Sequence, residues 1–393
     1  MMIESSSKAL ILSCSLLVVG LMMMDFFNPT FPVIMRSMGS SQILMKNMVV
    51  LYMLILGVAQ LVYGAASDHY GRRPLIIIGL FVAVVGLMAS AFCSSIWELY
   101  LARSITAFGA ASCTVISRAI ILDAYKTQGD IKSAFSYFTL SSQLSPAIAP
   151  IIGAYIAHRY GWRASFICLG AMVLAATVFI LASMPEYNKK RYASSFLSCV
   201  KTYSKIPDAQ SFYLYSFSSA VIFSFTIGFY VASPYALDAE GFNQIQISYF
   251  FSLYALGIFM GAFTSSRFTA DRADVLYSAL LLTMFIVLIV FYNLSISTWY
   301  IIALFSFLVA FLGGASAPLS MFFCMRYIKE NKGVAGALQG SLKMFFAGIM
   351  LVFFDYVYIS SMSSLVSIFL VFSVFLMATN GYLLYRGRVL FRA

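Results

Sequence analysis

Long apolar runs separated by short polar segments follow one another along the whole chain. Each run is about 20 residues long, which lets an α-helix cross about 30 Å of hydrocarbon at a rise of about 1.5 Å per residue. A membrane barrel would instead show alternating segments of about ten residues, and these are absent. The pattern predicts an all-α membrane protein with twelve transmembrane helices, at about 8–31, 47–66, 74–94, 97–120, 134–157, 163–184, 211–233, 246–267, 275–294, 298–322, 334–357 and 364–385.

Composition supports a membrane protein and excludes a soluble one. Hydrophobic residues make up 62% of the chain and charged residues 10%, whereas a soluble domain has about 25% charged residues. The net charge is +11, but the basic residues separate the apolar runs and do not form one patch, so we expect no nucleic-acid partner.

The distribution of Lys and Arg predicts the orientation, because cytoplasmic loops of polytopic proteins are enriched in both. With the N-terminus inside, the cytoplasmic segments hold 19 of the 25 basic residues and the outer segments hold four. The other two, Arg103 and Lys343, lie within predicted spans. We therefore expect a multi-pass protein of the inner (cytoplasmic) membrane with both termini in the cytoplasm.

A polar stretch divides the chain after the sixth span. We expect an N-terminal six-helix bundle at 1–185, a cytoplasmic linker at 186–210 and a C-terminal six-helix bundle at 211–393. The loop after the second span, GAASDHYGRRP, is weakly similar to the loop after the eighth, GAFTSSRFTADR. Paired halves of this kind suit a transporter in which one bundle rocks against the other.

The sharpest motif joins the second and third predicted spans and contains Gly64, Asp68, Gly71, Arg72 and Arg73. Glycines permit a tight turn and close helix approach, and the arginines can meet Asp68 and nearby helix ends. Such a loop can also serve only to set topology. The motif resembles the G-x-x-x-D-x-x-G-R-[RK] signature of the major facilitator superfamily, which implies a cytoplasmic latch that stabilises an outward-facing state.

Further segments resemble the drug/proton antiporters of the bicyclomycin and chloramphenicol resistance type within that family. The matching segments are Asp25-Phe-Phe-Asn-Pro-Thr-Phe-Pro32, Arg103-Ser-Ile-Thr-Ala-Phe-Gly109, Arg118-Ala-Ile-Ile-Leu-Asp123, Ser145-Pro146-Ala-Ile-Ala-Pro150-Ile-Ile-Gly153 and Gly161-Trp-Arg163. Within them, Pro146, Pro150 and Gly153 resemble the antiporter motif of the fifth span. An ordinary kinked helix is the alternative for these three residues.

Two charges at similar depth are the candidates for proton coupling. A charged side chain at the centre of a membrane helix costs about 2.5–3.5 kcal/mol, so it normally faces a cavity or a partner. Asp25 and Arg103 each lie about 9 Å from the outer end of their predicted spans, at about 1.5 Å per residue. We predict that the two side chains pair, that Asp25 carries the proton and that Arg103 tunes it. A purely structural ion pair is the alternative.

Lys343, Gln339 and Gln143 are candidates for the substrate cavity. Gln339 and Lys343 are four residues apart and share a helix face. Two buried cations against one buried carboxylate favour a neutral or anionic ligand, such as an anionic siderophore. Alternatively, Lys343 reaches along the helix to the cytoplasmic surface.

No catalytic, metal-binding or cofactor-binding pattern accompanies these features. The two histidines lie far apart, and the cysteines at 14, 93, 113, 168, 199 and 324 have no CxxC spacing. No G-x-x-x-x-G-K-[ST] loop is present, which disfavours an ATP-driven pump.

We therefore expect a monomeric carrier without cofactor that exports small amphipathic compounds in exchange for protons by alternating access. Its partners would be the small-molecule substrate, protons and the bilayer. An importer of a metabolite or siderophore is the nearest alternative. A membrane enzyme and a transport-inactive sensor are more distant ones.

Overall fold

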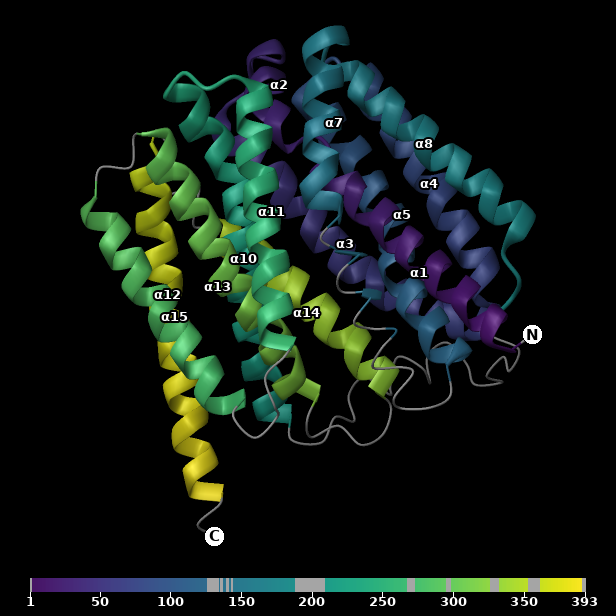
Figure 1. Cartoon of the computed structure of the whole chain (residues 1–393). Coiled ribbons are helices and arrows are strands. Elements are labelled where there is room, and N and C mark those ends of the chain that lie inside the picture. Colours follow the sequence, from purple (N-terminus) through teal and green to yellow (C-terminus); the bar gives the residue numbers. More distant parts are fainter. Residues whose placement is uncertain are drawn as a thin grey trace.

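The computed structural model consists of helices packed side by side along one direction (Figure 1). It describes residues 2–125, 134, 137–138, 141–142, 144–187, 209–266, 273–294, 298–325, 332–352 and 361–390. No strand occurs among these residues. The prediction of an all-α fold is confirmed.

The helices follow the apolar runs of the sequence. Their bounds are α1 Met2–Asp25, η1 Asn28–Thr30, α2 Phe31–Ser37, α3 Gln42–Tyr70, α4 Arg72–Phe92, α5 Ile96–Ala124, α7 Leu144–Tyr160, α8 Trp162–Ser183, α10 Ala209–Ala239, α11 Gln244–Ser266, α12 Ala273–Asn293, α13 Trp299–Met325, α14 Lys332–Val352 and α15 Met362–Leu390. Ten segments of the described chain are long and apolar enough to cross a membrane, α1 to α2 counting as one. With α7 and α14 they match the twelve predicted spans.

The first span is broken, whereas the sequence predicted a continuous helix over 8–31. α1 ends at Asp25, a 3₁₀ turn follows at Asn28–Thr30, and α2 then begins at Phe31. Pro29 and Pro32 stand in the first turns of these two short elements. Because proline has no N–H to donate, it is tolerated at a helix start but interrupts a running helix. The break places Asp25 at a helix end.

In the N-terminal part α4 packs on both α5 and α8, and α1 packs on α5 and α7. In the C-terminal part α11 packs closely on α13, where a Cβ at Gly261 would lie 2.0 Å from the Phe311 carbonyl oxygen. Only glycine fits at such an approach. Gly257, where a Cβ would lie 2.7 Å from the Phe307 carbonyl oxygen, is a packing residue in the same way.

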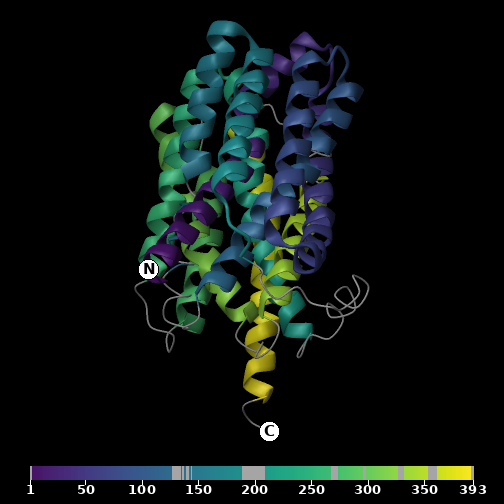
Figure 2. The ribbon, with the colours of Figure 1, turned by 90° about the vertical axis from the view of Figure 1, so that its right-hand side faces the viewer.

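Helices from the two halves of the sequence meet along two seams, α3 against α14 and α7 against α11. Ser341 Oγ donates to the Gly57 carbonyl at 2.8 Å in the first seam, and Ser252 Oγ donates to the Ala147 carbonyl at 2.8 Å in the second. α1 begins and α15 ends at the same end of the molecule, as an even number of spans requires (Figures 1 and 2). Most of the predicted linker at 186–210 lies outside the described residues, and the division into two bundles stays a prediction.

Candidate functional site

Asp25 is buried at the end of α1, with 6% of its surface exposed. Ser145 Oγ, in the first turn of α7, donates a hydrogen bond to Asp25 Oδ2 at 2.8 Å. The carboxyl group thus has a neutral hydroxyl as its partner, so it can gain or lose a proton without breaking an ion pair.

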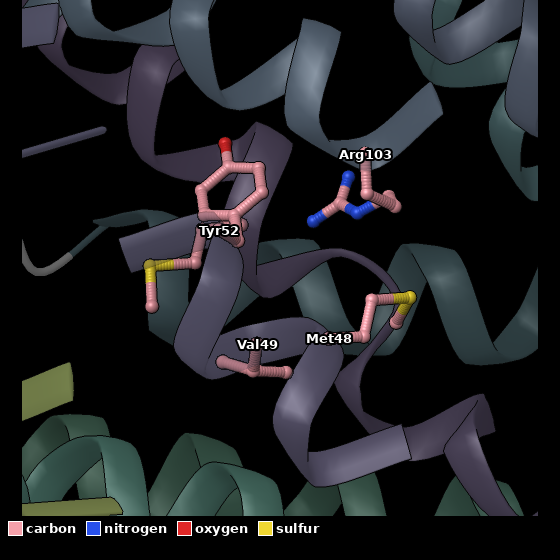
Figure 3. A pocket seen from close by; sticks show the side chains of 5 residues that line it. Met48, Val49, Tyr52 and Arg103 are labelled. Atoms are coloured by element: carbon pink, nitrogen blue, oxygen red, sulfur yellow. The ribbon is translucent and has the colours of Figure 1, made fainter. Parts of the chain in front are cut away.

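Arg103 on α5 is equally buried, with 5% of its surface exposed. Its Nη1 donates to the Met23 carbonyl oxygen at 2.9 Å, in the last turn of α1. The guanidinium carbon lies 4.5 Å from the centre of the Tyr52 ring, as Figure 3 illustrates, and 5.1 Å from that of Phe27. A cation is favourable both at a helix C-terminus and over an aromatic face. Arg103 therefore caps the broken helix that carries Asp25.

The predicted direct pairing of Asp25 with Arg103 is wrong for this conformation: the two side chains are described, and no ion pair joins them. The break in span one is the physical reason. It exposes the Met23 carbonyl to the guanidinium, and it leaves the carboxylate with Ser145. Arg103 therefore acts on Asp25 indirectly, by binding the α1 backbone at Met23, two residues before the carboxyl group.

A small pocket adjoins this arginine. It is lined by Met24, Met48, Val49, Tyr52 and Arg103 (Figure 3). The Tyr52 hydroxyl is buried and has no hydrogen-bond partner among the described residues. A polar atom left in this state is costly unless water or a ligand reaches it. In this conformation the pocket leaves no room for a water molecule, so the hydroxyl stays unsatisfied.

The three residues of the predicted antiporter motif, Pro146, Pro150 and Gly153, are all buried on α7. A Cβ at Gly153 would lie 1.9 Å from the Phe26 carbonyl oxygen. The glycine thus lets α7 contact the chain at the break in span one, and Ser145 lies on the same helix. The motif holds the hydroxyl against Asp25.

We expect Gly153→Ala to inactivate the protein, because the added methyl group would force α7 away from the break. Overpacking of this kind costs about 1–3 kcal/mol. Transport in vesicles should fall to background while the melting temperature in detergent drops. Gly381→Ala is the matched control, since a Cβ there meets nothing within 4 Å. Wild-type transport by Gly153→Ala would contradict this account of the motif.

The loop motif ends α3 and begins α4. Gly71 adopts a φ of +105°, a conformation that favours glycine. Arg72 Nε forms an ion pair with Asp123 Oδ2, at the end of α5, at 3.0 Å. Arg72 Nη1 also donates to Ser67 Oγ at 2.6 Å. The side chain of Asp68 and Gln143 as a whole lie outside the described residues.

Glu186 is a site residue that the sequence analysis missed. Its two carboxylate oxygens accept from the backbone N–H groups of Arg72 at 2.9 Å and of Arg73 at 3.1 Å. Arg73 Nη2 also donates to the Leu181 carbonyl at 2.7 Å, which is a second link between the start of α4 and the end of α8. A carboxylate at the first N–H groups of a helix is favourable. Glu186, three residues after the end of α8, thus caps α4. This contact joins residues more than 110 positions apart, so no local sequence pattern predicts it.

Glu186→Ala should destabilise the N-terminal helices by about 0.5–2 kcal/mol, the usual cost of a lost N-cap. Glu186→Gln keeps one acceptor oxygen and is expected to lose less. Thermal unfolding in detergent measures both. Equal melting temperatures for wild type and Glu186→Ala would show that the cap contributes nothing.

The predicted cavity residues of α14 face α10. Gln339 is buried and its Nε2 donates to Ser219 Oγ at 3.2 Å. Lys343 is partly buried, and its Nζ lies 4.7 Å from the centre of the Phe223 ring. Within the described residues, no group of His, Cys, Asp and Glu could hold a metal ion.

Comparisons with known proteins agree on the family. A sequence model of the Major Facilitator Superfamily matches residues 13–352. The chain is 23% identical to Multidrug resistance protein D of Escherichia coli over 354 residues, 88% of each chain. It is 24% identical to a Bicyclomycin resistance protein homolog of Haemophilus influenzae, over 83% of each chain. It is 31% identical to a Chloramphenicol resistance protein of Pseudomonas aeruginosa, over 60% of this chain and only 56% of that one.

Solved structures show the same fold at low identity. The human organic anion transporter MFSD10 (TETRAN) superposes with a TM-score of 0.72 at 16% identity, over 95% of this chain and 98% of that one. A bacterial homolog of the human lysosomal transporter Spinster, inward-facing and occupied, gives 0.73 at 13% identity, over 98% and 97%. Both superpositions cover at least 95% of this chain.

Proposed function

The chain belongs to the major facilitator superfamily and is a multi-pass membrane transporter, not an enzyme; on that basis we propose that it exports small amphipathic compounds in exchange for protons. Drugs and metabolites, an anionic siderophore among them, are its substrates. It works as a monomer in the inner membrane, with both termini in the cytoplasm and alternating access between two six-helix bundles.

The observation that carries this proposal is the environment of Asp25. The carboxyl group is buried at a helix break, held by one hydroxyl, and close to an arginine that binds the backbone two residues earlier. The Arg103 and Ser145 contacts come from α5 and α7, so a shift of either helix changes the surroundings of the carboxyl group. A cycle that alternates those surroundings can load the proton on one side and release it on the other.

One contact between the halves is suited to act as a gate, and a second set of contacts orders the loop motif within the N-terminal half. Arg36 on α2 pairs with Asp238 on α10 at 2.6 Å, and this bridge links the halves at the end away from the termini. At the other end, the Arg72–Asp123 pair and the Glu186 cap tie α4 to α5 and α8. We propose that the first bridge holds the outer side closed, and that the loop motif is the cytoplasmic latch.

Export is favoured because several relatives carry names of resistance proteins. The test uses inverted membrane vesicles and chloramphenicol as the probe. A pH gradient, acid inside, should drive uptake into inverted vesicles, and an uncoupler should abolish it. Uptake driven only in right-side-out vesicles would identify an importer, and uptake that ignores the gradient would remove the proton coupling.

A further inference from the structure

A second group of polar side chains lies between the two halves, away from Asp25. Arg118 on α5 and Gln60 on α3 both approach Gly340 on α14. A Cβ at Gly340 would lie 2.9 Å from Arg118 Nη1 and 3.2 Å from Gln60 Oε1. Lys343 follows Gly340 by three residues, so it lies on the same face of the helix. Residues from both halves therefore converge on one turn of α14.

The two cations of this group are uncompensated. Arg118 Nη1 lies at the turn of α14 that carries Gly340 and Lys343, so two like charges are brought to one turn. Within the part of the chain that the structure describes, neither of them is ion-paired. Lys343 lies near the middle of α14, where a cation costs about 2.5–3.5 kcal/mol and normally faces a partner or a cavity. The only aromatic contact of Lys343 among the described residues is with Phe223. An anionic ligand would neutralise the charge of this pair.

A separate feature also indicates a ligand. Gln60 is 1% exposed, and its Oε1 has no hydrogen-bond partner among the described residues, although Nε2 donates to Thr114 Oγ1 at 3.2 Å. This orphaned acceptor points at the same turn of α14 that Arg118 touches. Leaving it unpaired costs about 1–3 kcal/mol. A ligand that carries a hydroxyl or amide donor beside its anionic group would satisfy all three side chains.

We propose that Arg118, Lys343 and Gln60 form a subsite for an organic anion that also carries a hydrogen-bond donor. The inference rests on the proposed export function and assigns its substrate class. Arg118 and Lys343 come from opposite halves, so an anion between them converts a repulsion across the interface into two attractions. Binding would therefore favour the closed interface between α3, α5 and α14, which couples substrate recognition to the movement of the halves.

The experiment measures binding without any proton gradient. The probes are 6-hydroxy-2-naphthoate and its neutral analogue 6-hydroxy-2-naphthamide, titrated into purified protein in detergent by calorimetry. Wild type should bind the carboxylate at least tenfold more tightly than the amide. Arg118→Gln and Lys343→Gln should each lose this preference while the affinity for the amide stays within twofold, which also shows that the variants are folded. Lys343→Arg keeps the charge and should retain the preference.

A wild type without carboxylate preference, or charge-neutral variants that keep it, would overturn the subsite. So would equal weakening of both probes in folded Lys343→Gln, since that indicates a packing role. Failure of the export function is a separate result, because it is seen as chloramphenicol uptake that ignores the pH gradient. The anion preference can fail while gradient-driven uptake of this neutral probe survives.

Discussion

Asp25→Asn is expected to abolish proton-driven accumulation of substrate. One pH unit is worth about 1.36 kcal/mol per proton, so tight exchange of one proton for a neutral substrate allows about tenfold accumulation for each unit of gradient. An amide keeps the size and polarity of the side chain but cannot carry a proton. The accumulation ratio of chloramphenicol in inverted vesicles should therefore fall to one, whatever the imposed gradient.

Exchange of labelled for unlabelled substrate at equal concentration separates coupling from folding. It needs no net proton movement, so Asp25→Asn should retain it. Ser145→Ala removes the hydroxyl partner of Asp25 but leaves the carboxyl group in place. Gradient-driven accumulation should survive that change. Accumulation by Asp25→Asn at the wild-type level would show that another group carries the proton.

The fold was largely predictable because lipid imposes a simple rule. Every backbone group must be satisfied internally, so each long apolar run becomes a helix. The break at Asp25 was not predicted, because prolines in membrane helices are tolerated in many contexts and the hydrophobic pattern runs on through Pro29 and Pro32. The positions of α3 and α5 were predicted, but both helices extend a few residues beyond the apolar pattern.

The site was predictable only in part. Asp25 and Arg103 stood out because a charge inside hydrocarbon is costly, and both are buried. Their actual partners, Ser145 and the Met23 carbonyl, depend on a backbone break and on a helix 120 residues away in sequence. Arg118, near the inner end of the predicted span 97–120, was counted with the cytoplasmic basic residues, yet its side chain lies beside Gly340 of α14. Charge counting cannot distinguish the last turn of a span from the loop that follows.

Cross-linking the outer bridge is expected to stop transport completely and reversibly. Arg36 and Asp238 belong to opposite halves, and their side chains meet at 2.6 Å. The pair itself is weak, worth about 0–1 kcal/mol, because 56% of the arginine side chain and 34% of the aspartate side chain are exposed. Replacing both with cysteine should thus leave transport near wild type. A short bifunctional methanethiosulfonate would then bridge the halves covalently, and uptake in vesicles should fall to background.

This expectation requires that the outer ends of α2 and α10 separate once in every transport cycle. If the outer ends of α2 and α10 must separate to release substrate, a bond that outlasts the cycle blocks every turnover. Dithiothreitol, which reduces the disulfides that attach the cross-linker, should then restore transport. The variant is made with the native cysteines replaced by alanine, and each single cysteine treated with the same reagent is the control. Full transport by the cross-linked double variant would mean that α2 and α10 stay together throughout, so that the substrate leaves by another route and the proposed outer gate is wrong.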